Sequence, residues 1–255
     1  MMITVTDLHK SYGAKDAVRG ISFSVEAGEM VAFLGPNGAG KSTTVKILTC
    51  LIRPTSGSAT VAGCDILRDP MGVKGHIGYV PESGALFESL TAWEYLQFVA
   101  ELHHLDRKAA GQRIEELLTL FGLDREKDQR LQQYSKGMKQ KVLICSAVLH
   151  NPDVLFLDEP LNGLDANAAF VFKEVLRRLA QQGKAILFCS HILDVVEKLC
   201  PRIMIVNEGV LIAEGTPETI AAATKTGSLE EAFCQLTGVR SAQDSAADFL
   251  QALGS

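Results

Sequence analysis

The chain has 255 residues, of which 47% are hydrophobic and 22% are charged, and its formal net charge is −5. This composition is that of a globular protein, so it excludes global disorder and predicts one large domain or two small ones. The acidic balance disfavours a protein whose main partner is a nucleic-acid backbone. No charge-free stretch approaches the ~18 apolar residues of a membrane-spanning helix. Residues 1–7 lack the basic and apolar regions of a secretory signal, so we expect a chain that is neither secreted nor integral to a membrane.

Apolar runs of strand length alternate with helical patterns, which predicts an α/β domain. Residues 3–8 and 18–25 alternate polar and apolar side chains and are expected to be half-buried strands, whereas Met30–Leu34 is continuously apolar and predicts a buried central strand. Later buried strands are expected at 77–80, 154–157, 185–189 and 203–206, and further strands on an antiparallel edge at 57–62 and 210–213. Helices are expected from Lys41 and at 91–103, 107–122, 136–150, 167–182 and 192–199.

The organisation that follows is one domain over residues 1–220 with an all-helical insertion at about 88–150, where no strand pattern occurs. Residues 221–255 predict a small helical tail. The six cysteines contain no C-x-x-C pair, which favours reduced, buried thiols in a cytosolic protein over a metal cluster.

A glycine-rich segment between the strand Met30–Leu34 and the next helix fits the pattern G-x-x-x-x-G-K-[ST]. Its glycines let backbone N–H groups approach phosphate oxygens, and the helix N-terminus adds the positive end of its dipole. Lys41 is expected to reach the β- and γ-phosphates, and the Ser42 hydroxyl to bind Mg²⁺. An ordinary glycine-rich turn is the alternative, and the flanking strand and helix argue against it. The residues predicted to bind ATP here are Gly35, Pro36, Asn37, Gly38, Ala39, Gly40, Lys41, Ser42 and Thr43.

Two acids, Asp158 and Glu159, follow the buried strand 154–157. Carboxylates at the carboxyl end of such a strand project into the crevice where α/β proteins bind ligands. Asp158 is suited to hold Mg²⁺, and Glu159 to orient or deprotonate an attacking water. Acids also cap helices at such places, so the pair alone is a weak indication of a catalytic site. It becomes a strong one because the same sequence also contains a phosphate-binding loop.

The stretch Tyr134–Gln140 completes a resemblance to the nucleotide-binding subunits of ATP-binding-cassette (ABC) transporters. It resembles their signature, L-S-G-G-Q followed by x-Q, because Ser135, Gly137 and Gln140 match. Tyr134, Lys136 and Met138 depart from the commonest form. The resemblance extends over roughly residues 3–220. It implies the fold of a P-loop NTPase: a parallel-sheet core, an antiparallel β edge subdomain and an inserted α-helical subdomain.

The resemblance also implies roles for single residues. Two subunits would pack head-to-tail, so that Ser135 and Gly137 of one touch the γ-phosphate held by Lys41 of the other; a plain helix cap is the alternative reading of Ser135. His191 matches a switch histidine that contacts the γ-phosphate. The remaining implied roles are adenine stacking by Tyr12, a dimer contact at Asp165, and a metal contact at Glu82, where the family usually has Gln.

The function implied is ATP hydrolysis that powers a membrane transporter, with ATP and Mg²⁺ as cofactors. The expected partners are a second copy of the chain and transmembrane permease subunits on other chains, with no nucleic acid. The subunit would then be cytoplasmic and peripheral at the inner face of the cell membrane. The short linker and the signature variant favour an exporter over an importer. A soluble ABC ATPase of DNA repair or translation, and a nucleotide sensor without turnover, are the alternatives. The transported substrate is not encoded in these motifs.

Overall fold

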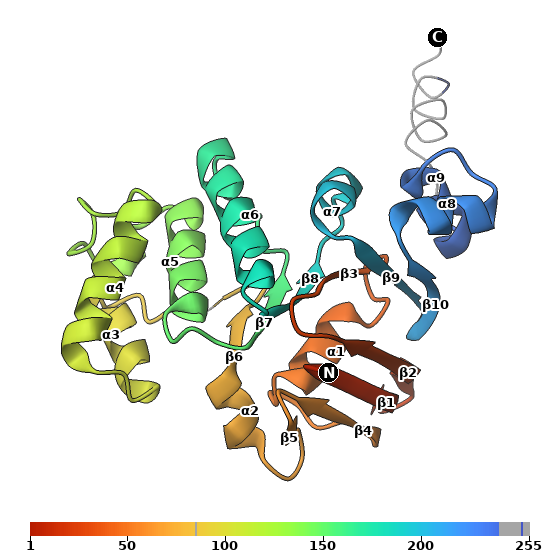
Figure 1. The fold of residues 1–255 in the computed structure, drawn as a ribbon, viewed down its shortest axis with the longest axis horizontal. Helices are drawn as coiled ribbons and strands as arrows, with labels where there is room; N and C mark the ends of the chain where they lie inside the picture. The colour runs from red at the N-terminus through yellow and green to blue at the C-terminus, as the bar shows by residue number, and fades with distance from the viewer. Residues whose placement is uncertain (85, 240–250, 252–255) are drawn as a thin grey trace.

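The computed structural model describes residues 1–84, 86–239 and 251, which form an α/β core with a helical lobe beside it (Figure 1). The main sheet has six strands in the order β10-β9-β3-β8-β7-β6, and every pairing in it is parallel except that of β10 with β9. Its strands are β3 (Met30–Leu34), β6 (Ile77–Val80), β7 (Val154–Asp158), β8 (Ala185–Cys189), β9 (Arg202–Asn207) and β10 (Val210–Gly215).

The continuous apolar run of β3 reflects burial on both of its faces. Val31 and Phe33 belong to a core shared with α1 (Lys41–Leu48), whereas Ala32 and Leu34 belong to a core shared with α5 (Lys136–Val148), α6 (Ala166–Gln181) and α7 (Leu193–Leu199). Successive strand residues point to opposite faces, so a strand covered on both sides needs an unbroken apolar sequence. The predicted central strand is confirmed at its predicted bounds.

A second, antiparallel sheet lies on the α1 side of the main sheet, and α1 packs against strands of both sheets. The predicted strand at 57–62 belongs to this sheet, whereas that at 210–213 forms the antiparallel edge of the main sheet. The antiparallel sheet has the order β2-β1-β4-β5 and comprises β1 (Ile3–Tyr12), β2 (Lys15–Val25), β4 (Ser56–Val61) and β5 (Cys64–Asp65).

The helical lobe between β6 and β7 is the inserted α-helical subdomain expected of the fold, while the bounds 88–150 stay a prediction. It contains α3 (Ala92–Leu102), α4 (Arg107–Leu120), the short 3₁₀ helix η1 (Leu131–Gln133) and α5. A capping box starts α3, because Thr91 accepts a hydrogen bond from the Glu94 amide and Glu94 returns one to the Thr91 amide. The helix α2 (Pro70–His76) was not predicted; its two glycines weaken the helical pattern, and Asp69 caps it.

The C-terminal part of the described chain forms α8 (Pro217–Thr224) and α9 (Leu229–Thr237). Leu229 and Ala232 of α9 are buried in the same core as the main-sheet strands, so α9 docks on the α/β core itself. Residues 240–250 and 252–255 of the predicted helical tail lie outside the described residues. The division at residue 220 stays a prediction, and α8 begins just before it.

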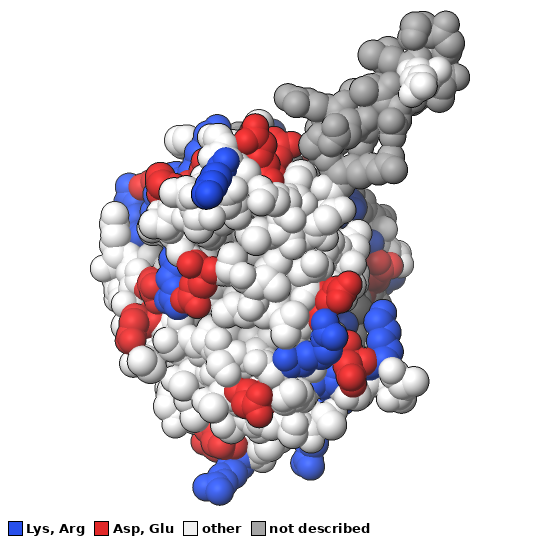
Figure 2. Space-filling model, turned by 90° about the vertical axis from the view of Figure 1, so that its right-hand side faces the viewer, with Lys and Arg blue, Asp and Glu red and all other residues white. Residues whose placement is uncertain are grey.

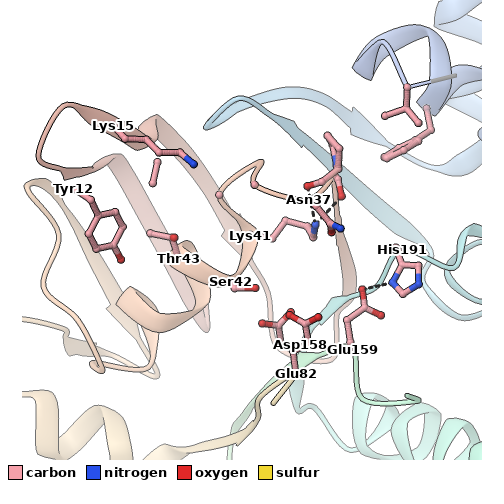
Figure 3. Close-up of a pocket in the computed structure, with 17 residues that line it drawn as sticks. Tyr12, Lys15, Asn37, Lys41, Ser42, Thr43, Glu82, Asp158, Glu159 and His191 are labelled. Carbon is pink, nitrogen blue, oxygen red and sulfur yellow. Dashed lines mark hydrogen bonds and ion pairs between the residues drawn. The ribbon is translucent and has the colours of Figure 1, made fainter. Parts of the chain in front are cut away.

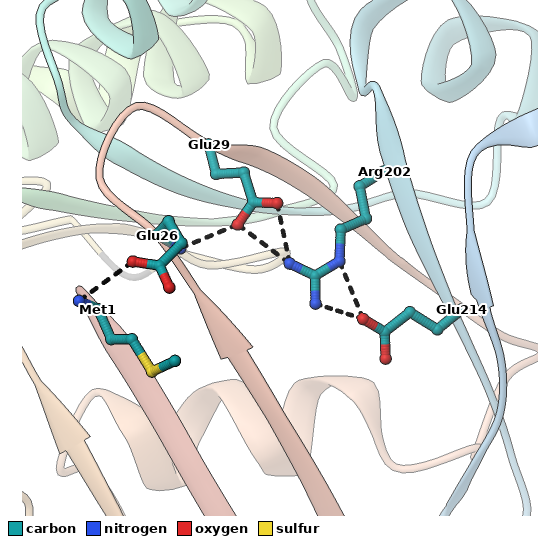
Figure 4. Close-up of polar contacts among 5 residues, drawn as sticks. All are labelled: Met1, Glu26, Glu29, Arg202 and Glu214. Carbon is teal, nitrogen blue, oxygen red and sulfur yellow. Dashed lines mark hydrogen bonds and ion pairs between the residues drawn. The ribbon is translucent and has the colours of Figure 1, made fainter.

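An ion-pair network joins the elements at the amino end of the parallel strands (Figure 4). Arg202, at the start of β9, donates to both carboxylate oxygens of Glu29 at 2.9 and 3.0 Å, and to Glu214 on β10 at 2.9 Å. Glu29 also accepts a hydrogen bond from the Glu26 amide, and the Glu26 carboxylate lies 3.1 Å from the N-terminal amine. This network lies at the end of the sheet opposite to the loops described next.

Candidate functional site

The loops that follow β3, β6, β7 and β8 line a cavity of about 820 Å³ at the carboxyl edge of the main sheet. These four strands are neighbours in the sheet, so segments far apart in the sequence converge there. The predicted residues on the cavity wall, drawn in Figure 3, are Tyr12, Gly35, Pro36, Asn37, Gly38, Gly40, Lys41, Ser42, Thr43, Glu82, Asp158, Glu159 and His191. The predicted loop residue Ala39 is 3% exposed and is not on the wall.

The phosphate-binding loop is held by close backbone packing. Gly40, directly before α1, has a φ of 105°, and a Cβ there would lie 2.4 Å from the carbonyl oxygen of Ala17 on β2. Only glycine fits this position, which explains the second invariant glycine of the motif. Lys41 Nζ donates to the carbonyl oxygens of Gly35 at 2.7 Å and Pro36 at 3.1 Å, so its ammonium group spans the loop. The loop thus presents an ammonium group and a helix N-terminus to an anion.

Oxygen atoms suited to a divalent cation gather beside this loop. Asp158, at the end of β7, is 3% exposed. Burial raises the pKa of Asp158, and the carboxylates of Glu82 and Glu159 raise it further, while a hydrogen bond with Ser42 and the charge of Lys41 oppose the rise. A cation would relieve this crowding of negative charge. Hydroxyl and carboxylate oxygens are the hard donors that Mg²⁺ prefers, so Ser42, Asp158 and Glu82 fit that ion.

Glu159 is fixed by three hydrogen bonds. Its side chain is 8% exposed, Oε1 lies 2.7 Å from His191 Nδ1, and Oε2 accepts a hydrogen bond from Ser190 Oγ at 3.2 Å. Its backbone N–H donates to the Cys189 carbonyl oxygen at 2.9 Å. Both partners of the carboxylate follow β8, so the neighbouring strand orients it. A buried, oriented carboxylate beside a phosphate-binding loop is suited to act as a general base.

Tyr12 ends β1 at the rim of the cavity and is 50% exposed. Lys10 Nζ lies 5.1 Å from the centre of the Tyr12 ring, in a cation–π contact, and donates to the Arg53 carbonyl oxygen at 2.9 Å. The ring thus lies beside a fixed cation and remains accessible, as a stacking surface for a planar base requires.

The signature residues Ser135 and Gly137 lie elsewhere, as does the predicted dimer contact Asp165, because none of the three lines the cavity. Ser135 caps α5 by accepting a hydrogen bond from the Met138 amide at 3.2 Å. A Cβ on Gly137 would lie 2.3 Å from the Gly163 carbonyl oxygen, so this glycine allows the start of α5 to touch the loop before α6. Asp165 has the ordinary role of a helix cap, because it accepts a hydrogen bond from the Ala168 amide at the start of α6. Its carboxylate also forms an ion pair with Lys141 at 2.9 Å.

Comparison with known proteins decides the family. Residues 18–162 match a family model described as ABC transporter. The ABC transporter ATP-binding protein NatA of Bacillus subtilis is 37% identical over 238 residues, an alignment that covers 91% of this chain and 96% of NatA. The chain belongs to the ABC transporter family. The linearmycin resistance ATP-binding protein LnrL of the same organism is 37% identical over 249 residues, covering 94% of this chain and 79% of LnrL.

Solved structures agree on the cassette fold. The structure of an ATP-binding subunit of an ABC transporter aligns with a TM-score of 0.88 at 34% identity, covering 92% of this chain and 99% of that one. A dimeric structure of MJ0796, a bacterial ABC transporter cassette, aligns with a TM-score of 0.78 at 25% identity, covering 84% and 98%. The chain is therefore an ATP-binding subunit of the ABC type and an ATPase.

The cassette's cavity also contains residues that the motifs did not indicate. Lys15 and Ala17 enter from β2, and Phe233 and Val239 from the C-terminal segment. No sequence motif includes them, and only the packing of β2 and α9 beside the phosphate loop brings them there.

Within the described residues, no helix combines the length and apolarity needed to cross a lipid bilayer.

Proposed function

We propose that two copies of this subunit hydrolyse ATP at their shared interface and thereby drive a membrane transporter. The observation that carries the proposal is the separation, within one chain, of the phosphate-binding cavity from Ser135 and Gly137, which do not line it. Ser135 starts a helix, so its hydroxyl and the first amides of α5 form a second anion-binding end. A second chain that brings this end to the first cavity completes the site. The structure of the MJ0796 cassette is dimeric, which supports the formation of a dimer by this chain as well.

The reaction is transfer of the γ-phosphoryl group from ATP to water. Water attacks the γ-phosphorus, Glu159 accepts its proton, the bond to the β-phosphate oxygen breaks, and ADP and inorganic phosphate leave. His191 and Ser190 hold Glu159 in place through the hydrogen bonds described above. Lys41 and the loop amides stabilise charge on the phosphate oxygens. Mg²⁺, held by Ser42, Asp158 and Glu82, would supply further positive charge at the β- and γ-phosphates.

The nucleotide's adenine would stack on Tyr12, and its phosphates would follow the loop from Gly35 to Thr43. In the dimer, Asp165 would lie near the interface in addition to capping α6. The proposed C-terminal unit begins at residue 221, and within the described residues its helix α9 is anchored on the core.

The partners we propose are a second copy of the chain and transmembrane permease subunits, which would hold the cassette at the inner face of the cell membrane. Closure of the dimer by ATP and its reopening after hydrolysis would pass to the permease through the helical lobe α3–α5. A resistance protein among the relatives, LnrL, supports export as the direction. On the face in Figure 2, acidic and basic side chains are intermixed, which disfavours a nucleic-acid partner.

The test uses Glu159→Gln, which keeps the shape of the side chain but removes its basicity. ATP should bind while hydrolysis stalls, so size-exclusion chromatography with ATP and Mg²⁺ should give a stable dimer. The matched control is the double variant Lys41→Ala, Glu159→Gln, which should remain monomeric because it loses the phosphate contact. A monomeric Glu159→Gln subunit at saturating ATP contradicts both the base role and the shared interface.

Mixing two inactive variants tests action between chains. Ser135→Arg should damage only the partner's site, whereas Lys41→Ala damages its own. A heterodimer of the two contains one intact site and one doubly damaged site, so mixing should restore part of the ATPase activity. Absence of rescue in a demonstrated heterodimer argues against the head-to-tail arrangement.

A further inference from the structure

The hairpin between β1 and β2 carries two cavity-lining side chains at its tip. Tyr12 and Lys15 are directly paired across the strands, and the turn between them consists of Gly13 and Ala14. Side chains of such a pair project from the same face of a hairpin with Cβ atoms about 5 Å apart. Both residues line the cavity, so the hairpin places an ammonium group beside the exposed aromatic ring (Figure 3).

The neighbouring residues leave this ammonium group without a counter-charge. Asp16 is the acid adjacent in sequence, but its carboxylate accepts a hydrogen bond from Ser11 Oγ at 2.6 Å, and Ser11 and Asp16 form the next cross-strand pair, which projects from the other face. The ammonium group of Lys15 has no ion pair or hydrogen bond with any residue in the described part of the chain, although its backbone belongs to the β1–β2 ladder. Lys10, the other lysine near Tyr12, instead donates a hydrogen bond to the Arg53 carbonyl oxygen at 2.9 Å.

Charge is distributed unevenly in the cavity. The three carboxylates on its wall, those of Glu82, Asp158 and Glu159, lie together on one side of Lys41. Lys15 lies on the other side, toward Tyr12, and its amine points toward the part of the cavity where Lys41 lies. A ligand that stacks on Tyr12 and reaches Lys41 with its terminal phosphates therefore passes Lys15 between these two ends.

We propose that Lys15 is a nucleotide-binding residue that pairs with the α-phosphate of the bound nucleotide. The α-phosphate is the anionic group between the base and the β-phosphate, and it fits an unpaired ammonium group that lies between Tyr12 and Lys41. The inference rests on the proposed placement of the nucleotide in this cavity. The contact is made equally to ATP and to ADP, and hydrolysis does not change the α-phosphate, so Lys15 contributes to binding rather than to the chemical step.

The experiment compares ATP and ADP binding by the full-length subunit and its Lys15→Gln variant in the absence of Mg²⁺. The dissociation constants of both nucleotides should rise by the same factor, about three- to tenfold at low salt, and the factor should shrink in high salt. In the steady state KM for ATP should rise while kcat is unchanged. Lys15→Arg keeps the charge and should restore most of the affinity. Lys46→Gln, an exposed lysine of α1 that does not line the cavity, is the matched loss of one charge and should leave binding unchanged.

The outcomes separate this inference from the proposed function. If the wild-type subunit binds ATP but Lys15→Gln binds it equally well, the inference is wrong and the proposed function stands. If Lys15→Gln weakened the binding of ATP but not of ADP, the ammonium group would lie at the γ-phosphate, and the assignment of Lys15 to the α-phosphate would be wrong. A wild-type subunit that binds neither nucleotide would overturn both. Because Lys15 is exposed, its replacement should leave the thermal midpoint unchanged, which excludes misfolding as the cause of a loss.

Discussion

A pair of stacked histidines predicts that acid weakens the joint between the helical lobe and the core. His103 follows α3 and His150 follows α5, and their ring centroids lie 3.6 Å apart with an interplanar angle of 13°. His150 Nε2 donates to the Ile77 carbonyl oxygen at 2.9 Å, whereas its Nδ1 is buried and has no partner among the described residues. The ring is therefore neutral, with its proton on Nε2. A second proton on Nδ1 would create a buried charge without an acceptor.

The size of the effect follows from the pKa of His150. Burial lowers this pKa from 6.5 to about 4, and the nearby charges of His103, Arg113 and Lys184 add to the fall. The unfolded chain thus binds more protons between these two values, and stability that is present above pH 6.5 is lost as pH falls toward 4. At pH 5 the difference in pKa corresponds to at most about 2 kcal/mol. Because His150 is only partly buried, solvent screening reduces the expected loss to about 1 kcal/mol.

The assay is urea-induced unfolding at pH 7.5 and pH 5.0 in the wild type and in His150→Gln. The amide of Gln can still donate to the Ile77 carbonyl oxygen but does not titrate. The loss of unfolding free energy on acidification should therefore be about 1 kcal/mol smaller in His150→Gln than in the wild type. His103→Gln should show an intermediate loss, because burial also lowers the pKa of His103 and its charge contributes to the lowered pKa of His150. Equal pH dependence in all three proteins would refute the reasoning.

Four further predictions follow from single contacts. Lys41→Ala removes the ammonium group that spans the loop, so ATP affinity should collapse and ATPase activity should fall by about 100-fold or more, as measured by phosphate release; near-normal turnover would refute the loop assignment. Glu82→Gln should raise the Mg²⁺ concentration for half-maximal ATPase, because a carboxylate is the harder ligand; an unchanged value in the Mg²⁺ titration would mean that Glu82 does not contact the metal. Arg202→Met leaves two carboxylates without their cation and should lower the unfolding free energy in urea by about 1–2 kcal/mol, since the network is partly exposed; unchanged stability would show that the network contributes nothing. Gly137→Ala places a methyl group against the Gly163 carbonyl oxygen and should cost about 1–3 kcal/mol in the same assay, whereas Gly122→Ala, at a position with open space around it, tests only the backbone conformation.

The fold was predictable where one local signal dominates. The strands at 30–34, 77–80 and 185–189 have the predicted bounds, because strands buried on both faces must be apolar throughout. The helix α2 was not predicted because Pro70, Gly72 and Gly75 weaken the helical pattern of its sequence. The one local indication of this helix is its N-cap residue, Asp69. The sequence also did not predict which sheet each edge strand joins. Residues 57–62 and 210–213 have similar patterns, yet they pair in different sheets, because strand pairing depends on contacts between residues far apart in the sequence.

The lining of the cavity was predictable where a sequence pattern constrains the backbone. A phosphate loop needs glycine at fixed spacing, so the sequence pattern and the close approach of Gly40 to Ala17 express the same requirement. Lys15 and Phe233 belong to no such pattern. Their presence in the cavity depends on a hairpin register and on the docking of α9, and neither follows from the sequence near the loop.

The arrangement of the two acids shows how a strained residue serves the site. Successive residues of a strand point to opposite faces, so an extended backbone would direct Asp158 and Glu159 away from each other. Glu159 instead has a φ of 50°, in the left-handed region that costs a non-glycine residue about 1–3 kcal/mol. That turn brings both carboxylates to one cavity, and the hydrogen bonds of Glu159 to Cys189, Ser190 and His191 offset the strain. Because all three partners belong to β8 or directly follow it, the position of the proposed base depends on the pairing of β7 with β8. Any movement of the loop after β8 would therefore displace the proposed base, so the geometry of this side of the cavity depends on that loop as well as on β7.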